Sequence, residues 1–239
     1  MDKTRQDNYK VLIIPFVIVL AVLLILFKKD YLVVLNLSLF NNTIYNNEAN
    51  YQVATLVLAF LVLIISYILN PKNFKKFLRW GKINASIKPV KYLGINPDEN
   101  ENWYHLGRNF AVIISLVTLI VIYFQIVYQQ SIQFNIGIIP IVLLFAISNS
   151  FVEEIIFRFS LVSVLFDSLP HKYIYLLSGF IFGIGHYFGV PGQIPGVLMA
   201  GFIGWFLAKS IGETKGIFWA WFIHFLQDVI IFIGLFISA

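Results

Sequence analysis

Long uninterrupted runs of apolar residues, separated by short polar stretches, set the pattern of this chain. A helix rises about 1.5 Å per residue, so about 20 apolar residues cross the hydrocarbon core of a bilayer. Seven runs approach that length, and they cover residues 11–27, 51–69, 109–128, 137–166, 173–188, 194–208 and 217–238. The pattern predicts an all-α polytopic membrane protein, a bundle of seven transmembrane helices, or eight if residues 31–50 contain a further span.

The composition supports the same class. The chain has 239 residues, of which 59% are hydrophobic and 12% are charged, whereas soluble domains have about 45–50% apolar and about 25% charged residues. We interpret the whole length as one membrane domain, with N-terminal spans and a basic loop in residues 1–108 and a helical bundle in residues 109–239. The chain has no Cys, which excludes disulfides and a Cys nucleophile and leaves His and carboxylates as metal ligands.

The distribution of basic residues predicts the topology. With the N-terminus in the cytoplasm, the inner segments hold fourteen Lys and Arg residues and the outer segments hold two, Lys28 and Lys29. This bias is a positive-inside signal and favours the cell membrane as the location. The basic residues lie in short loops, so nucleic acid is not expected as a partner; the basic loop 71–108 is expected on anionic lipid headgroups.

Two connecting features are harder to place. Residues 31–50 are interrupted by polar positions and contain five Asn between 41 and 50. We expect an interfacial or extracytoplasmic segment there, with the Asn residues marking a loop. The run 137–166 would be about 45 Å long as one helix, so we expect it to tilt, to protrude, or to kink near Pro140.

Small residues recur every fourth position in the fifth and sixth runs. Gly179 and Gly183 have this spacing, as do Gly196, Ala200 and Gly204. Such spacing lets helix backbones approach closely in a membrane. We therefore expect the last four spans to pack as a tight bundle.

The run 137–166 also carries three charges, Glu153, Glu154 and Arg158. A charge at the centre of a bilayer helix costs roughly 2.5–3.5 kcal/mol on insertion scales, so each needs a partner or a function. Glu154 and Arg158 are four residues apart with the acid first, which favours an ion pair. Glu153 lies about 100° round the helix from Glu154, so we expect it to face a different partner.

Later runs supply candidates for that partner. His186 stands alone in its run, and His224 and Asp228 are four residues apart on one helix face. Any one of them is more often a structural polar contact than a ligand. Their concentration in three spans instead indicates a site, because scattered structural groups would have no reason to gather.

Two chemistries are open for such a site. Two His with carboxylates could hold a divalent metal, most naturally zinc, whose bound water ionises near neutral pH. Without a metal, Glu153 and His186 could activate a water while His224 and Asp228 hold an oxyanion. Either route predicts hydrolysis by an activated water. No local motif marks a Ser nucleophile.

Three motifs occur in order in these spans, namely Glu153-Glu154-x-x-x-Arg158, Phe182-x-x-x-His186 and His224-x-x-x-Asp228. The set resembles the CPBP intramembrane proteases, also called the CAAX-protease and bacteriocin-processing family or Abi. The resemblance covers about residues 140–230 and implies an all-helical membrane endopeptidase that acts on a membrane-associated peptide or protein.

The resemblance also implies roles for the motif residues. Glu153 and His186 would activate the water, His224 and Asp228 would complete the site as ligands or oxyanion stabilisers, and Glu154 with Arg158 would support it. A zinc ion would be bound by His186, His224, Asp228 and Glu153. Many members have Asn at the position of Asp228; the added negative charge favours a cation there.

Two other functions fit the same polar cluster. Some family members are inactive, so the chain could be a membrane immunity or regulatory scaffold in which the cluster only holds the bundle together. Buried Glu, His and Asp also mark ion pathways, as in an ion-coupled transporter. Against the transporter, the sequence shows no inverted repeat.

Overall fold

The computed structural model describes residues 3–26, 37–128, 130–132 and 135–238, and every regular element in these ranges is a helix. The α-helices are α1 (Lys3–Leu26), α2 (Thr43–Leu69), α3 (Pro71–Phe77), α4 (Trp103–Ile122), α5 (Ile139–Glu154), α6 (Ser160–Leu165), α7 (His171–Gly185), α8 (Gln193–Thr214) and α9 (Phe218–Ile237). Four short helical segments are η3 (Lys91–Leu93), η4 (Tyr123–Val127), η5 (Ile136–Ile138) and η6 (Ile155–Phe159), of which η4 and η6 are π-helical.

Five helical stretches in the described part of the chain are long and apolar enough to cross a membrane. They are Thr43–Leu69, Trp103–Val127, Ile136–Leu165, Gln193–Thr214 and Phe218–Ile237. The apolar part of α1, Tyr9–Ile25, is shorter, and α7 has only 15 residues. The structure therefore confirms an all-helical, multi-pass membrane protein, whereas a count of seven or eight spans is not confirmed.

The start of α2 corrects the loop expected in residues 31–50. Residues 31–36 lie outside the described residues, but α2 begins at Thr43, so positions 43–50 are helical. The Asn side chains make that start. Asn42 Oδ1 accepts hydrogen bonds from the backbone N–H groups of Ile44 and Tyr45, which caps the free donors of the first turn.

Two more Asn side chains tie the preceding chain to this helix. Asn46 accepts from the N–H of Phe40 at 2.8 Å and donates to its carbonyl at 2.7 Å. Asn50 makes the same pair of bonds with Leu37. An amide side chain pairs with a backbone as another peptide would. The Asn-rich stretch is thus a helix start rather than a loop.

The fourth apolar run forms one continuous helical stretch, Ile136–Leu165, made of η5, α5, η6 and α6, with Pro140 close to its start. That proline lies in the first turn of α5, where its missing N–H costs no hydrogen bond. The irregularity lies further along, in the π-helical turn η6, where the N–H of Ser160 bonds to the carbonyl of Ile155. A π-turn inserts one residue and rotates everything after it.

The sixth run is also longer than expected, because α8 continues to Thr214. Lys209, which charge counting placed in an inner loop, is therefore helical and only 2% exposed. Its ammonium group pairs with Glu213 and donates to the carbonyl of Lys88 at 2.7 Å. Glu213 in turn accepts from the indole N–H of Trp103 at 2.9 Å. This polar clasp holds the loop before α4 against the end of α8.

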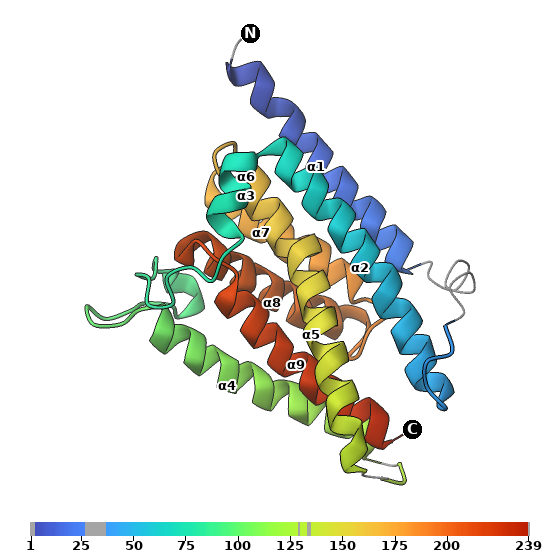
Figure 1. Cartoon of the computed structure of the whole chain (residues 1–239). Helices are drawn as coiled ribbons and strands as arrows, with labels where there is room; N and C mark the ends of the chain where they lie inside the picture. Colours follow the sequence, from blue (N-terminus) through green and yellow to red (C-terminus); the bar gives the residue numbers. More distant parts are fainter. Residues whose placement is uncertain (1–2, 27–36, 129, 133–134, 239) are drawn as a thin grey trace.

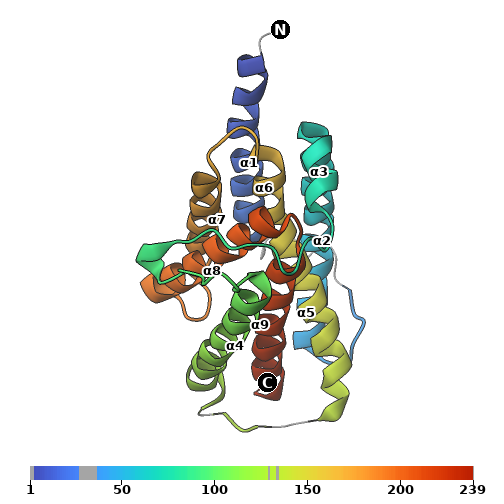
Figure 2. The same ribbon diagram turned by 90° about the vertical axis from the view of Figure 1, so that its left-hand side faces the viewer.

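The helices pack into a bundle with the termini at opposite ends (Figure 1). α5 packs against α9, and α9 against α4. α7 packs along α8, which lies oblique to α4, α5 and α9 (Figure 2). α1 packs on α6 and α2 on α5, so the N-terminal helices share the bundle, and the boundary expected at residue 108 falls inside α4.

The close approach expected from small residues occurs between α7 and α8. A Cβ atom added to Gly179 would lie 2.6 Å from the carbonyl oxygen of Gly201, and one added to Gly183 would lie 2.6 Å from that of Val197. No side chain fits those gaps. The prediction of tight packing is confirmed for this pair of helices.

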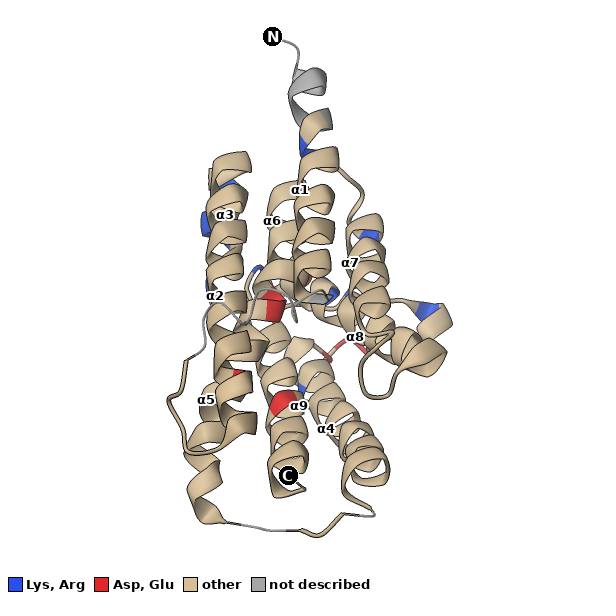
Figure 3. Ribbon diagram, turned by 90° about the vertical axis from the view of Figure 1, so that its right-hand side faces the viewer, with Lys and Arg blue, Asp and Glu red and all other residues tan. Residues whose placement is uncertain are grey.

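Charged residues fall into two groups (Figure 3). Lys and Arg lie mainly around α3, the start of α7 and the loop before α4, whereas acidic residues also occur inside the body of the bundle. Charge inside an apolar bundle is costly unless it is paired. The buried acids are therefore the place to look for a function.

Candidate active site

The π-turn η6 sits directly after the two glutamates and orients them. Glu153 and Glu154 end α5, and the next five residues form η6. Arg158 lies inside this turn and is 0% exposed. π-turns recur at functional sites because they re-aim side chains without ending the helix.

Glu154 contacts two side chains, those of Arg158 and His224, through a single carboxylate oxygen, Oε1. Arg158 Nη1 lies 3.2 Å from it, which confirms the ion pair expected from the spacing. The Nδ1 atom of His224, on α9, lies 2.7 Å from the same oxygen. The expected pair of Glu154 and Arg158 therefore has a third member, His224. Glu154 fixes the ring of His224 as well as the guanidinium.

The other ring nitrogen of His224 faces two more carboxylates. Its Nε2 lies 3.3 Å from Glu153 Oε2 and 3.7 Å from Asp228 Oδ1. Glu153 thus finds its partner across the α5–α9 interface, as the helix geometry indicated. A protonated imidazole donates from both nitrogens, so His224 has carboxylate acceptors on both sides.

Asn149 is a further member of the site that the motifs did not reveal. Its Nδ2 lies 3.1 Å from Asp228 Oδ2 and 3.4 Å from Glu153 Oε1. The amide therefore bridges the two carboxylates that face His224. The signal in the sequence was its position one helical turn before Glu153, on the same face.

Phe182, the first residue of the second motif, packs against the buried charged residues. The guanidinium carbon of Arg158 lies 3.5 Å from the centre of its ring, a close cation–π contact. The ring centre also lies 4.1 Å from that of His186 and 6.0 Å from that of His224. One aromatic ring thus lies close to the buried arginine and to both histidines.

His186 ends α7 and has one defined hydrogen bond. Its Nδ1 lies 2.9 Å from the carbonyl oxygen of Phe182. A carbonyl only accepts, so Nδ1 carries the hydrogen, and in the neutral ring Nε2 is left as an acceptor. Because α7 is short, His186 reaches the same cavity as His224.

That cavity has a volume of about 90 Å³ and lies among α4, α7, α8 and α9. Besides the two histidines its lining includes Thr118, Gln227 and Met199. Buried water needs at least about 10–15 Å³ of such space and several polar partners. Both conditions are met beside the histidines.

The side chains expected to bind a metal are not grouped as a metal site in this structure. Among the described residues, no group of three or more His, Asp or Glu is placed so that it could hold a metal ion. Both ring nitrogens of His224 contact carboxylates within the cluster, and Nδ1 of His186 is bound to the carbonyl oxygen of Phe182. We derive no step through a metal, and zinc binding stays a prediction from the sequence.

Comparisons with known proteins address the same region. Residues 135–230 match the Rce1-like family of type II CAAX prenyl endopeptidases. This confirms the family resemblance drawn from the three motifs. The match covers less than half of the 239 residues and contains all of the motif residues. No curated protein and no solved structure matches the chain.

The Rce1-like stretch coincides with the elements that build the cluster. It runs from the start of η5 through α5, η6, α6, α7 and α8 to the part of α9 that carries His224 and Asp228. From outside this stretch, Tyr51 on α2 interacts electrostatically with Glu153 and Asp228. The site therefore lies in the matched region, and α2 packs beside it.

Proposed function

We propose that this chain is an intramembrane endopeptidase that hydrolyses a peptide bond with a water activated by Glu153. The observation that carries the proposal is the position of His224, held by Glu154 and facing both Glu153 and Asp228. A polar clasp that served only the bundle would need one partner for each charge. Here a histidine has carboxylates on both sides beside a cavity.

Each residue has a distinct part in this chemistry. Glu153 takes the proton of a water, with the free Nε2 of His186 as a second acceptor. The water adds to the peptide carbonyl, and the N–H of His224 stabilises the negative oxygen that forms. The proton held by Glu153 then passes to the leaving amine. Asp228 and Asn149 keep the His224–Glu153 geometry, and Glu154 with Arg158 anchors it.

The substrate is a peptide or protein carried in the membrane. The family name denotes CAAX prenyl endopeptidases, and the cavity next to the histidines is lined mostly by apolar side chains such as Ile122, Ile203 and Ile231. Apolar lining suits a lipid-anchored or membrane-embedded peptide. A farnesylated CAAX peptide is therefore the first probe.

The proposed mechanism needs no zinc, unlike the prediction from the sequence, and a measurement distinguishes the two. The tests are metal content of the purified protein and cleavage after exhaustive chelation, in the parent and in Asp228→Asn. We expect activity without bound metal and retention of activity within about tenfold in Asp228→Asn, since Asn fills the same space and can donate to an oxyanion. Stoichiometric zinc that disappears with activity in His224→Ala would establish a metalloprotease instead.

The decisive test of the proposed function compares Glu153→Gln with a matched control, Glu99→Gln, which alters an exposed loop glutamate. Cleavage of the farnesylated peptide is followed by mass spectrometry in detergent and in liposomes. We expect loss of at least about 10²-fold in Glu153→Gln, the usual size of a general-base contribution, and parent activity in the control.

The two other functions predict different results. In a scaffold, no parent cleavage is seen and Glu153→Gln keeps the partner-dependent phenotype with unchanged stability. In an ion-coupled transporter, liposomes containing the parent show proton flux that Glu153→Gln abolishes. Cleavage that survives unchanged in Glu153→Gln would contradict the proposed mechanism.

A further inference from the structure

A second cluster of charge lies outside the site, around the ring of Phe166 at the end of α6. The ammonium group of Lys215 lies 3.9 Å from the ring centre and that of Lys76 lies 4.9 Å from it. The imidazole of His171 stacks on the same ring at 3.9 Å. Three basic side chains from α3, α7 and the end of α8 therefore share one aromatic platform.

Lys215 and the two basic side chains around it, Lys76 and Lys88, outnumber the two acids that act on it, Glu213 and Asp167. Among the described residues, no ion pair joins Lys76, Lys88 or Lys215 to a carboxylate. Two acids lie nearby: Glu213 is bound by Lys209, whereas Asp167 keeps its charge, because its partner Asn73 is a neutral amide that donates at 2.9 Å. Burial, with Lys76 and Lys88 nearby, lowers the pKa of the Lys215 ammonium to about 8.

The backbone of Lys215 adds an independent sign. Lys215 ends α8 in the left-handed conformation, with φ of 58°, where Gly or Asn is usual. Its side chain reaches back to the carbonyl of Gly212 and over Phe166. A lysine at a position that favours glycine motivates the hypothesis that its charge has a function.

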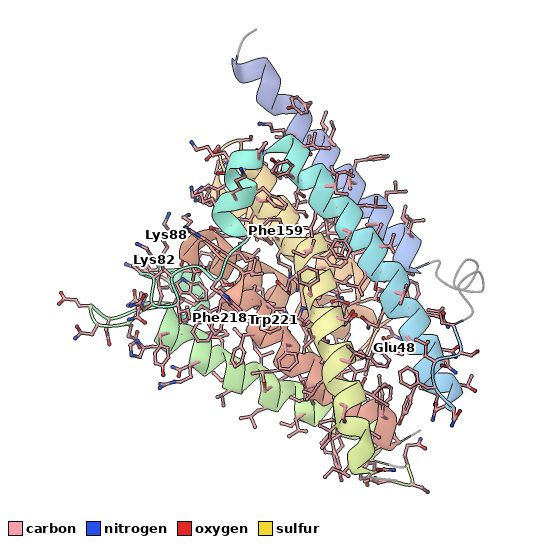
Figure 4. All side chains as sticks on the ribbon, viewed as in Figure 1. Glu48, Lys82, Lys88, Phe159, Phe218 and Trp221 are labelled. Carbon is pink, nitrogen blue, oxygen red and sulfur yellow. The ribbon has the colours of Figure 1, made fainter. Side chains whose placement is uncertain are left out.

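An apolar groove begins beside this cluster. Arg79 donates from Nε to the carbonyl of Lys215 at 3.0 Å and lines one end of a groove of about 290 Å³. The remaining lining residues come from the end of α3, from α5 and from α9, and are Leu78, Trp80, Ile147, Phe151, Ile217 and Trp221. Figure 4 labels Lys82 and Lys88 in the loop beside this end of the bundle and Trp221 on α9.

We infer that this cluster and groove bind one anionic phospholipid, with its phosphate among Lys76, Arg79 and Lys215 and an acyl chain along α5 and α9. Charge complementarity selects an anion, and cations at the mouth of an apolar groove suit a molecule that is charged at one end only. Trp80, which lines the groove, is 61% exposed, and exposed Trp residues are typical of a membrane surface.

The test is binding of phosphatidylglycerol, phosphatidylcholine and glycerol phosphate to the full-length protein in detergent, by native mass spectrometry and thermal shift. The double variant Lys76→Gln/Arg79→Gln is compared with Lys72→Gln/Lys75→Gln, which removes two exposed lysines of the same helix α3. A groove-filling variant, Ile147→Trp, alters a residue that is 47% exposed and is therefore tolerated by the fold.

We expect phosphatidylglycerol to bind most tightly. Each lost cation costs about fivefold in affinity, which is about 1 kcal/mol, so the first double variant loses about 25-fold and its control much less. Ile147→Trp weakens phosphatidylglycerol binding with the cluster intact. Glu153→Gln binds as the parent does, which separates this inference from the proposed catalysis.

Three results would overturn the inference. Equal losses in the two double variants would mean that general surface charge attracts the lipid. Equal affinity for glycerol phosphate would reduce the site to a phosphate site with no acyl chain. Unchanged phosphatidylglycerol binding in Ile147→Trp would show that the acyl chain does not occupy the groove.

Discussion

His224 and Glu154, separated by 70 residues in the chain, are joined by a contact of 2.7 Å between Nδ1 and Oε1. Glu154 also binds Arg158, so the carboxylate that balances the buried guanidinium is the one that holds the histidine ring. Glu154 thus stabilises the fold, by pairing with Arg158, and positions the ring of His224. The two effects are distinguished by substitutions at Glu154 and Arg158.

Glu154→Gln should lower both stability and activity. The substitution leaves Arg158 buried without its counter-charge, and breaking a buried ion pair typically costs about 3–5 kcal/mol. The second variant, Glu154→Gln with Arg158→Met, removes both charges and should recover much of the stability. Activity should stay low in both, because the neutral amide of Gln holds the His224 ring more weakly than a carboxylate does. Thermal unfolding in detergent and peptide cleavage measure the two effects; recovery of activity in the double variant would contradict a positioning role.

Asn149→Ala should reduce kcat/KM without unfolding the protein. Asn149 donates to Asp228 and Glu153, and a hydrogen bond to a charged group contributes about 1.5–3 kcal/mol, or about 10–150-fold in rate. Asn149→Asp should be worse, because it adds a carboxylate beside two others. The neighbouring Ser148→Ala is the control, since Ser148 Oγ has no hydrogen-bond partner among the described residues. Equal activity in all three would exclude Asn149 from the site.

Gly183→Ala should disturb the packing that places His186. Its Cβ would lie 2.6 Å from the carbonyl oxygen of Val197 on α8, and overpacking costs about 1–3 kcal/mol. On the same helix, Gly185→Ala would meet only Val22, at 3.9 Å, and should be tolerated. Thermal unfolding and cleavage rates of the two variants test the prediction. A Gly183→Ala protein as stable and active as Gly185→Ala would refute it.

Binding of the anionic lipid should weaken as the pH rises through about 8. Below that pH Lys215 is protonated and attracts phosphate, and above it the side chain is neutral, because its pKa is lowered to about 8. The charges that act on it are Lys76, Lys88, Glu213 and Asp167, and Lys215 itself acts on His171. We expect a loss of about fivefold for this one charge.

Lys215→Arg provides the control for that titration, since arginine stays charged throughout. Its lipid affinity should be flat between pH 7 and 9. Affinities measured by thermal shift at each pH compare the two proteins. A parallel fall in parent and variant would assign the titration to another group.

Single-cysteine labelling should place the loop before α4 in the cytoplasm. The chain has no Cys, so each introduced thiol reports alone. A membrane-impermeant maleimide added to intact cells should label Ser131→Cys, between α4 and α5. It should label Asn100→Cys only after the cells are permeabilised. Both positions are exposed. The reverse pattern would invert the topology expected from the basic residues.

Much of the fold and part of the site followed from local pattern. The apolar runs predicted helices, and the helical period predicted that Glu154 meets Arg158 and that His224 meets Asp228, as the structure shows. Residues one turn apart on a helix are neighbours whatever the tertiary structure. Such contacts are encoded in spacing, so the sequence determined them alone.

Helix ends and irregularities followed less well, because they depend on hydrogen bonds outside the repeating pattern. The Asn residues around 42–50 looked like a loop, since Asn is a turn former; in the structure they cap α2 and bind the preceding backbone. The π-turn η6 has no proline or glycine to announce it. Lys209 looked like an inner-loop charge until Glu213 and the Lys88 carbonyl supplied its partners.

Only the tertiary structure decided which helices face each other and in what register. The contact of Glu154 with His224, the bridge from Asn149 to Asp228 and the placement of Arg158 on Phe182 all join different helices. Spacing within one helix says nothing of these pairs. They are set by the rotation and depth of each helix, which follow from packing the whole bundle at once.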